Sequence, residues 1–339
     1  MKANKELIPP GLSYLADNII SKDNLFGASK EKGARWAKNL NLPKESETVF
    51  FAGCGYQYLS ELESLLSLLR KIDKSAINTE MAISLASFQK KLGFDATNLY
   101  SRVAGRSSDT GARPLLDTVK VLSKLGLKFG YLAEREPCCG GLLYYAGRHK
   151  EFSRHAQEVS GHLKSSGVKQ IISIVPSCTY TLRNLMTSAV GGDGLVVKHF
   201  CEVVAENLPS LELRFPEAVK VTYHDPCQMV RYLSLVDEPR RILRAIKGIE
   251  FVEPEGTSGE WVTCCGGGGG FEIVFPELSE ICAVNRAREL VATGAEIIVT
   301  QCPACIMQLK VGLSQLKIDN VKVLDLAQIV AMAMGVSGE

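Results

Sequence analysis

The amino-acid sequence contains an internal duplication. The triplet Cys-Cys-Gly at residues 138–140 recurs at residues 264–266, an offset of 126. An apolar run at residues 171–175 recurs at residues 297–301, and the cysteines that follow the two runs, Cys178 and Cys305, lie 127 residues apart. Because a long stretch recurs in register, we expect the chain to be two copies of one structural unit.

Each copy alternates short strands with amphipathic helices. The β-rich runs at residues 49–52, 171–175, 219–223 and 297–300 each lead directly into a cysteine. Ligand sites of open α/β sheets lie at the carboxyl ends of parallel strands. We therefore predict an α/β fold of two pseudo-symmetric repeats with short, mostly parallel sheets, whose cysteine loops meet at a shared cleft.

The duplication divides the chain into three parts. Residues 1–45 contain no cysteine, and we expect a helical amino-terminal arm with helices near residues 12–21 and 30–40 and Trp36 as an anchor. Such an arm either packs on its own domain or docks a partner subunit, and we assign it to partner docking. Residues 46–210 would form the first repeat and residues 211–339 the second.

An insertion distinguishes the first repeat from the second. Cys54 precedes its double cysteine by 83 intervening residues, whereas Cys227 precedes its own by 36. The surplus falls at about residues 71–112, where a helix at residues 80–92 and a loop at residues 102–113 are expected. Such an insertion is either a surface excursion or a lid and docking element over the site.

The composition narrows the class of function. With 46% hydrophobic residues, 22% charged residues and a formal net charge of +2, the chain lacks the basic footprint of a nucleic-acid-binding protein. No apolar run reaches the length of a membrane span, and the first residues do not resemble a signal peptide, so we expect a cytoplasmic protein, membrane-associated through a partner if at all. Eleven cysteines in such a chain indicate metal rather than disulfides.

Five cysteines of the second repeat form the strongest chemical signal. A single cysteine, a pair of adjacent cysteines and a Cys-x-x-Cys motif follow one another, with 36 residues between one element and the next. Thiolates on converging loops bind soft metals and iron–sulfur clusters. Four thiolates would also satisfy tetrahedral zinc, so the fifth cysteine favours an unusual cluster.

A run of five glycines follows the double cysteine of the second repeat. Residues 266–270 fit neither the dinucleotide nor the phosphate-loop pattern, because Phe271 stands where a glycine is needed and no Lys-Ser/Thr follows. We expect the glycines, Gly266 first, to bring backbone amides close to a metal centre. Helices beginning after Cys305 and after Cys178 would direct their positive ends there.

These motifs resemble those of the cysteine-rich CCG-domain family. The resemblance rests on His-Asp-Pro-Cys at residues 224–227, Cys-Cys-Gly₅ at residues 264–270 and Cys-Pro-Ala-Cys at residues 302–305, and it extends over about residues 46–335. The family includes heterodisulfide reductase subunits B and D and the iron–sulfur subunits of glycolate and lactate oxidases. The resemblance implies a noncubane [4Fe–4S] cluster in the second repeat. By position, its ligands would be Cys227, Cys264, Cys265, Cys302 and Cys305.

The first repeat departs from the family pattern at one ligand. Val175 stands where the fifth cysteine is expected, which puts heterodisulfide cleavage by two facing clusters in doubt. Zinc, a second cluster and a metal-free packing role all remain open for this repeat. Its candidate ligands are Cys54, Cys138, Cys139 and Cys178.

Several residues outside the motifs have two interpretations. Cys201 and Cys282 lie in helical stretches without a cysteine at the equivalent repeat position, so we expect core residues. His224 is either a hydrogen-bond donor near Cys227 or a structural histidine. Arg231 and Arg240 either offset cluster charge or face solvent.

Three functions follow from the motifs and the resemblance. The first is an oxidoreductase subunit, active within a heterodisulfide-reductase-like complex, that transfers electrons to or from a disulfide, thiol or related sulfur substrate. The second is an electron relay between a flavin dehydrogenase and a quinone or membrane partner, and the third, less favoured, is a zinc-stabilised interaction module. Because the chain carries no flavin motif and no ferredoxin-type cysteine run, we expect it to work in a complex. The resemblance implies a ferredoxin-like iron–sulfur subunit and a flavin or membrane redox subunit as partners. We expect Arg102, Arg106 and Arg113 to attract an anionic substrate or acidic partner to the cleft.

Overall fold

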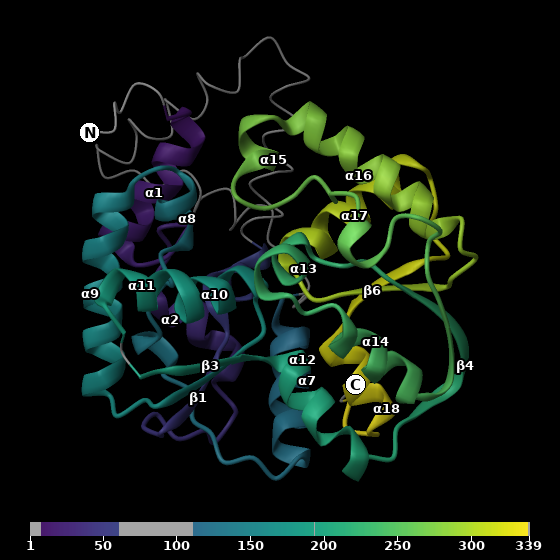
Figure 1. Ribbon diagram of the computed structural model, residues 1–339, viewed down its shortest axis with the longest axis horizontal. Coiled ribbons are helices and arrows are strands. Elements are labelled where there is room, and N and C mark those ends of the chain that lie inside the picture. The colour runs from purple at the N-terminus through teal and green to yellow at the C-terminus, as the bar shows by residue number, and fades with distance from the viewer. Residues whose placement is uncertain (1–7, 61–110, 193, 338–339) are drawn as a thin grey trace.

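Two separate parallel sheets, one in each half of the chain, form the framework of the structure (Figure 1). The computed structural model describes residues 8–60, 111–192 and 194–337. The first sheet has the order β1-β2-β3 and the second the order β5-β4-β6-β7, and all strand pairs are parallel. The strands are β1 Thr48–Phe51, β2 Gln170–Ser173, β3 Val196–His199, β4 Arg214–Tyr223, β5 Lys247–Val252, β6 Ile297–Thr300 and β7 Lys322–Asp325.

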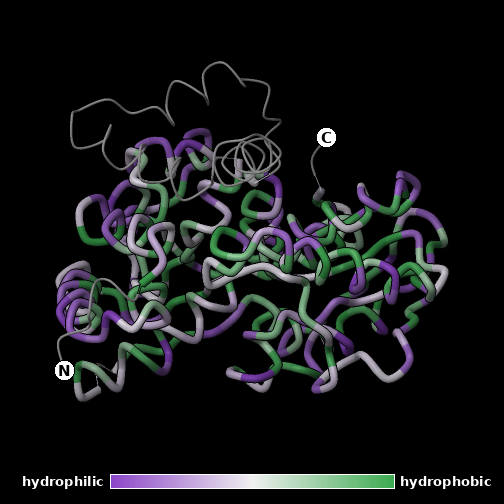
Figure 2. Tube along the Cα trace, turned by 90° about the horizontal axis from the view of Figure 1, so that it is seen from above, coloured by the Kyte–Doolittle hydropathy of each residue, from purple (hydrophilic) through white to green (hydrophobic). Residues whose placement is uncertain are grey.

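Helices cover both sheets, and the strand and helix alternation predicted from the sequence is confirmed. In Figure 2 the hydrophobic segments run through the interior of both halves, whereas the most hydrophilic stretches lie along the outside. The helices of the first half are α1 Pro10–Lys22, α2 Lys30–Ala34, α3 Gly53–Gln57, α7 Ala112–Lys124, α8 Gly141–Tyr145, α9 His149–Ser165, α10 Pro176–Tyr180, α11 Thr187–Val190 and α12 Phe200–Asn207. Those of the second half are α13 Cys227–Leu233, α14 Asp237–Ala245, α15 Phe271–Val274, α16 Pro276–Val291, α17 Pro303–Gln315 and α18 Leu326–Ala333.

The two sheets have the same topology apart from one edge. Where the second half has β5, the first half has an isolated bridge between Val49 and Gly130. The amino-terminal segment lies directly against the chain at residue 130. The N–H of Tyr131 donates to the carbonyl of Pro43 at 2.8 Å, and a side chain at Gly130 would lie 2.5 Å from that oxygen. The amino-terminal segment therefore covers this edge and prevents a full strand from forming.

Each repeat ends in a helix that is capped in the same way. The backbone N–H of His199 donates to Glu202, and 126 residues later the N–H of Asp325 donates to Gln328. The helices that follow are α12 and α18. Reciprocal capping of this kind satisfies backbone groups that a helix start leaves free, and its recurrence shows that the duplication includes the closing helix.

The amino-terminal arm packs on both halves of its own chain. Trp36 packs against the edge of Phe50, with ring centroids 5.8 Å apart, and its Nε1 donates to the Tyr131 hydroxyl at 3.1 Å, so the expected anchor is confirmed. Helix α1 contacts α8 of the first half and α15 of the second. The predicted insertion at about residues 71–112, including its helix at residues 80–92, lies outside the described residues up to residue 110.

Contacts between the repeats occur in pairs related by the duplication. Helix α10 packs on α13, and its counterpart α17 packs on α3; likewise α12 packs on α14, and α18 packs on α7. Each contact between two helices is therefore repeated between their duplicates, as expected for a pseudo-twofold interface. One continuous hydrophobic core extends through both halves.

Two residues of α3 make close contacts with the second repeat. A side chain at Gly55 would lie 2.7 Å from Cγ of Pro303 in α17, so only glycine permits this approach. The hydroxyl of Tyr56 donates to the buried carboxylate of Asp325. Both contacts join residues more than two hundred positions apart and tie α3 to the second repeat.

We expect Gly55→Ala to destabilise the protein by about 1–3 kcal/mol, because the new methyl group overlaps the fixed ring of Pro303. Gly161→Ala is a matched control, since Gly161 lies in α9 with no atom within 4 Å of the added methyl. The control should be neutral or up to about 1 kcal/mol more stable. Urea unfolding followed by circular dichroism measures both, and equal effects would contradict close packing between the repeats.

Candidate metal centre

The cysteines lie at the carboxyl ends of neighbouring strands. Cys227 is the first residue of α13, directly after β4, and Cys302 caps α17, directly after β6. Cys54 follows β1 in α3, and Cys178 follows β2 in α10. The placement predicted from the strand ends is therefore confirmed in both repeats.

The helix starts differ from the prediction by one turn. Helix α17 begins at Pro303, before Cys305, and α10 begins at Pro176, before Cys178. Proline favours the first helical position because its ring fixes φ and it has no N–H to leave unpaired. Cys305 and Cys178 therefore lie within the first turn of their helices.

The second repeat brings its sulfurs together at graded depths. The sulfurs of Cys265 and Cys305 lie 3.2 Å apart and are buried, whereas Cys264 is exposed. Cys227 and Cys302 are half-buried. The site thus combines buried thiols with an exposed one.

The glycine turn after the double cysteine approaches the site closely, as expected. Gly266 has φ +82°, and a side chain there would lie 2.2 Å from the carbonyl oxygen of Ser279. Its N–H donates to the sulfur of Cys264 at 3.3 Å. The turn therefore depends on glycine and directs an amide at a thiol.

The thiols of the second repeat differ in acidity. Hydrogen bonds from Cys264 and Cys305 lower the pKa of Cys265 well below the usual range of a thiol. The same hydrogen bonding raises the pKa of Cys264 and Cys305, and burial raises the pKa of Cys227 to about 11. The pKa of Cys265 is thus shifted in the opposite direction to those of Cys227, Cys264 and Cys305. Thiols that bind a metal give up their protons, so metal binding at this site would release protons.

The first repeat holds its four sulfurs as two buried pairs. Cys54 and Cys138 are 3.9 Å apart, and Cys139 and Cys178 are 3.4 Å apart. Val175 fills the fifth position, where its Cγ2 would lie 2.9 Å from a side chain at Gly53. Within the described part of the chain, three candidate ligand atoms approach within 4.8 Å of one another only in the second repeat, at His224, Cys265 and Cys305.

A buried carboxyl supports the first cysteine loop and was missed by the sequence reasoning. Glu136 accepts hydrogen bonds from the N–H groups of Ala52 at 2.8 Å and Gly53 at 2.9 Å. Burial raises the pKa of Glu136 to about 7. Its equivalent in the second repeat is Val262, so comparison of the two copies could have singled it out.

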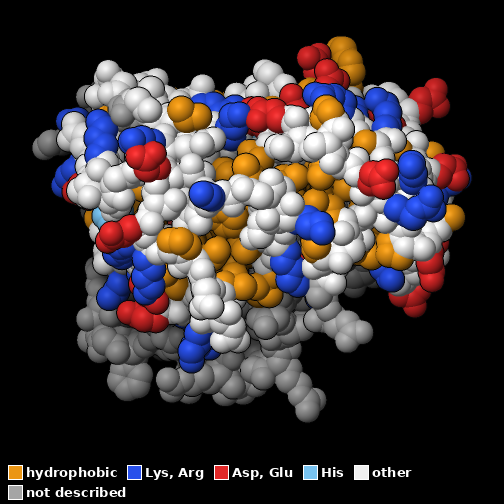
Figure 3. All heavy atoms as spheres, turned by 90° about the horizontal axis from the view of Figure 1, so that it is seen from below, with side chains coloured by type: hydrophobic (Ala, Val, Ile, Leu, Met, Phe, Trp, Pro, Cys, Tyr) orange, Lys and Arg blue, Asp and Glu red, His pale blue; other side chains and the backbone are white. Residues whose placement is uncertain are grey.

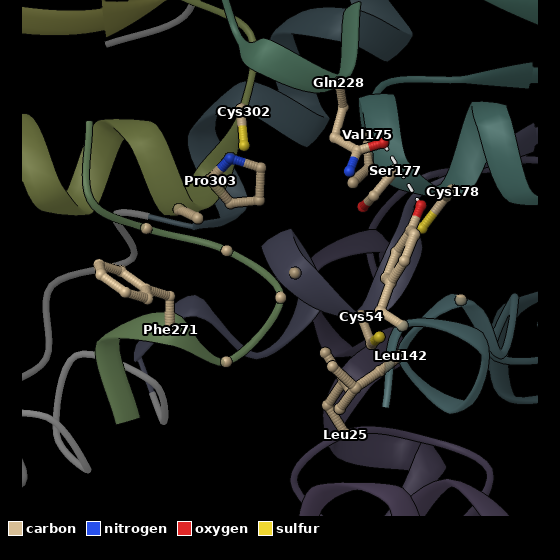
Figure 4. Close-up of a pocket in the computed structure, with 18 of the residues that line it drawn as sticks. Leu25, Cys54, Leu142, Val175, Ser177, Cys178, Gln228, Phe271, Cys302 and Pro303 are labelled. Carbon is tan, nitrogen blue, oxygen red and sulfur yellow. Dashed lines mark hydrogen bonds between the residues drawn. The ribbon is translucent and has the colours of Figure 1, made fainter. Parts of the chain in front are cut away.

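Cysteines of both repeats line one cavity of about 410 Å³, which confirms the expected shared cleft. In Figure 4, Cys302 and Pro303 lie on one side of the cavity and Cys54, Val175 and Cys178 on the other. The cysteines that line it are Cys54, Cys138, Cys139, Cys178, Cys227, Cys264, Cys302 and Cys305.

The rest of the cavity wall is largely apolar. Leu15, Leu25, Phe26, Leu142 and Phe271 contribute to it, and no lysine or arginine does so among the residues that the structure describes. Figure 3 shows that apolar side chains also gather over the middle of one face of the molecule, bordered by charged groups.

Three arginines were predicted at the mouth of the cleft, and the one that the structure describes, Arg113, does not lie there. Arg113 donates to Asp117 at 2.8 Å and to Ser337 at 2.6 Å and does not line the cavity. The expectation was wrong for this residue because Asp117, one turn further along α7, neutralises its charge. Arg102 and Arg106 lie outside the described residues.

The remaining basic candidates are held by neighbouring groups. Arg240 is buried in an ion pair with Asp225 at 2.7 Å and also binds Glu253, so it neither faces solvent nor is free to offset cluster charge. Asp225 additionally accepts the N–H of Gly259 at 2.8 Å. This carboxylate therefore anchors the segment that leads to the double cysteine. Arg231 donates to the carbonyl of Val262 at 3.1 Å.

The two cysteines outside the motifs differ in burial. Cys201 is fully buried beside His199, with its sulfur 3.2 Å from Nδ1, as expected for a core residue. Cys282 is only half-buried on α16, so the prediction of a core residue was wrong for this cysteine. Its helix presents neighbouring apolar residues to the surface, which leaves Cys282 at the edge of the core.

The cysteine-rich domain family, described as CCG, matches the chain twice, over residues 105–183 and 221–310. Both matches include a double cysteine and the Cys-containing strand end that follows it. Within the described residues, no helix is long and apolar enough to cross a bilayer.

Curated relatives of the chain are redox proteins. One component of the dihydromethanophenazine:CoB–CoM heterodisulfide reductase from Methanosarcina mazei is 34% identical over 64% of this chain and 54% of its own length. The EtfAB:quinone oxidoreductase of Syntrophomonas wolfei is 30% identical over 70% of this chain and 34% of its own. Lactate utilization protein A 1 of Bacillus mycoides is 26% identical over 57% of this chain and 80% of its own. The chain spans about half the length of the heterodisulfide reductase components that it matches.

Stability should fall as pH rises from about 4 to about 7 because of Asp325, the buried partner of Tyr56. Burial raises the pKa of the Asp325 carboxyl to about 7, so the folded state binds its proton more tightly than the unfolded chain does. The stabilisation by Asp325 is fully present below pH about 4 and is lost as pH rises through about 7. The free energy of unfolding then falls by up to about 1.4 kcal/mol per pH unit.

Asp325→Asn should flatten that pH dependence. Asp319→Asn, at an exposed position, serves as the control and should keep the wild-type profile. Urea unfolding at pH 5, 6 and 7 measures the slopes, and identical slopes for the wild type and Asp325→Asn would contradict a protonated Asp325 in the folded protein.

Proposed function

Because the chain belongs to the family defined by the cysteine-rich CCG domain, we propose that it is the iron–sulfur subunit of a heterodisulfide-reductase-like complex. The observation that carries this proposal is the convergence of five cysteines from three loops at the carboxyl edge of β4 and β6, beside a cavity. We propose that a noncubane [4Fe–4S] cluster is held by Cys227, Cys264, Cys265, Cys302 and Cys305.

The residues at the site fit such a cluster. The donor set of the five positions is entirely sulfur, which is the ligand that iron–sulfur clusters require. Gly266 keeps the backbone close to the sulfurs, and the starts of α13 and α17 direct their positive ends at the same region. When bound, the cluster would supply one-electron redox chemistry.

The proposed substrate is a disulfide or a related sulfur compound that enters the cavity. The exposed position of Cys264 leaves part of the site accessible, whereas Cys265 and Cys305 are buried. In the reducing direction, the S–S bond of the substrate breaks, two electrons arrive from the redox partner, two protons are taken up and two thiols are released. The chain's role would be to admit the disulfide and exclude bulk water.

We propose that electrons are exchanged with a separate ferredoxin-like subunit and a flavin or membrane redox subunit. The M. mazei relative is named as one component of a reductase, and this chain spans about half of it. Residues 1–45 are our proposed docking element: α1 packs on α8 and α15 of its own chain and places Leu15 at the cavity wall, so a partner bound to this arm would lie near the site.

An electron relay without a sulfur substrate is the second candidate. The apolar cavity wall, with no lysine or arginine in the described residues, favours an uncharged quinone-type partner molecule over an anionic thiol. Relatives named as a quinone oxidoreductase and as a lactate utilization protein support this alternative. Turnover of a small disulfide by the assembled complex would favour the first candidate over the relay.

For the first repeat we propose a four-thiolate centre, either zinc or a four-ligand cluster. Its four sulfurs are buried in adjacent pairs, and Val175 provides no fifth ligand. Four thiolates match the tetrahedral preference of zinc. The candidate ligands are Cys54, Cys138, Cys139 and Cys178.

Anaerobically purified protein should contain about four irons from the second repeat. Cys264→Ser and Cys302→Ser should abolish the cluster's EPR signal, because each removes a thiolate. Cys282→Ser is the matched control on nearby α16 and should leave the signal intact. Wild-type protein with stoichiometric zinc and no iron would contradict both redox proposals and favour the zinc-stabilised interaction module.

Removing a ligand of the first repeat should have a different effect. We expect Cys178→Ser to lower zinc content or the free energy of unfolding while the main EPR signal persists, because Cys178 belongs to the other metal site. Elemental analysis and EPR on the same sample measure both quantities. Loss of a second noncubane signal in this variant would show that the first repeat carries its own cluster.

A further inference from the structure

A buried arginine fixes the orientation of the histidine that precedes the first cysteine of the second repeat. Nδ1 of His224 accepts a hydrogen bond from Nε of Arg286 at 3.0 Å, and both side chains are almost completely buried. Arg286 is held in turn by the carbonyl of Thr257 at 2.9 Å and by Glu289 at 2.7 Å. The guanidinium therefore cannot move away from the imidazole without breaking several buried bonds.

The arginine also decides which ring nitrogen carries the proton. A guanidinium Nε–H only donates, so Nδ1 of His224 must present its lone pair. In the neutral ring, the hydrogen is then on Nε2. A metal ion needs a lone pair from its ligand, so this tautomer makes His224 a donor toward the sulfurs rather than a ligand.

Nε2 of His224 is the ring nitrogen that Arg286 leaves available to the sulfurs. It has no hydrogen-bond partner in the described part of the chain, although it is buried. Yet the ligand atoms of His224, Cys265 and Cys305 all lie within 4.8 Å of one another. An unpaired buried N–H is costly, and the two thiols are the groups within reach that become strong acceptors as metal-bound thiolates.

The first repeat lacks this arrangement. Phe51 occupies the position equivalent to His224, and Ser160 occupies the position equivalent to Arg286. Both members of the pair are thus present together in the repeat with five cysteines and absent together from the repeat with four. The pair therefore accompanies the five-cysteine site and not the fold that both repeats share.

We propose that His224, oriented by Arg286, is a positioning residue that donates its Nε2 hydrogen to the metal-bound sulfur of Cys265 or Cys305 and thereby raises the reduction potential of the centre. This inference rests on the proposed iron–sulfur function. Hydrogen bonds to cluster sulfurs favour the reduced state, which carries more negative charge. Removing the donor should make reduction roughly tenfold less favourable, which is about 59 mV for a one-electron couple.

The experiment compares His224→Phe with His224→Gln in the full chain, purified anaerobically with its metal. The phenylalanine fills the space without a donor, whereas the glutamine amide restores an N–H at similar reach. His199→Phe is the matched control, because His199 is equally buried but its ring nitrogens face the carbonyl of Ile174 and Cys201. The readouts are iron content and the midpoint potential from an EPR-monitored redox titration.

We expect His224→Phe to keep its iron and to titrate at a lower potential, with His224→Gln and His199→Phe close to the wild type. If His224→Phe loses its iron while His224→Gln retains both iron and potential, the donor role is also supported. An unchanged potential in His224→Phe would overturn the inference, and so would loss of iron from both His224 variants. In either case an iron-loaded wild type leaves the proposed function intact, whereas a wild type without iron would overturn both.

Discussion

The packing of α3 on α17 and of α10 on α13 is the contact on which the site depends. Parallel pairing within each sheet brings two cysteine loops to one edge, but each sheet alone would leave that edge open to solvent. The pseudo-twofold contacts place the two edges against each other, with Gly55 touching Pro303. The shared cavity is a consequence of this contact rather than of either repeat.

One fold thus supports two different environments for sulfur. In the first repeat, four buried thiols lie at the wall of the shared cavity, and the buried carboxyl of Glu136 supports their first loop. In the second, an exposed Cys264 faces the cavity, and His224 with Arg286 lies behind the enclosed sulfurs. The four buried thiols of the first repeat suit a structural or relay centre, and the exposed Cys264 of the second suits contact with a substrate.

Negative charge at the second site would be compensated mainly by dipoles. Arg240 is neutralised by Asp225 and Glu253, and Arg286 by Glu289, whereas the exposed Arg231 acts on Cys227, where its charge opposes the rise in the thiol pKa that burial causes. Amide groups such as that of Gly266, helix starts and the imidazole N–H are fixed dipoles that favour thiolates without full positive charge. Such a site can change its charge by one electron with little rearrangement of the surrounding protein.

The sequence by itself determined the duplication, the α/β alternation and the cysteine loops, because these are local patterns repeated at a constant offset. It also indicated Gly266 and the departure at Val175. Only the tertiary structure decided that His224 meets Arg286, that Tyr56 meets Asp325, and that α1 supplies apolar wall to the cavity. The expectation for Arg113 failed for the same reason: which charges pair, and which face a cavity, depends on long-range packing that leaves no periodic signal in the chain.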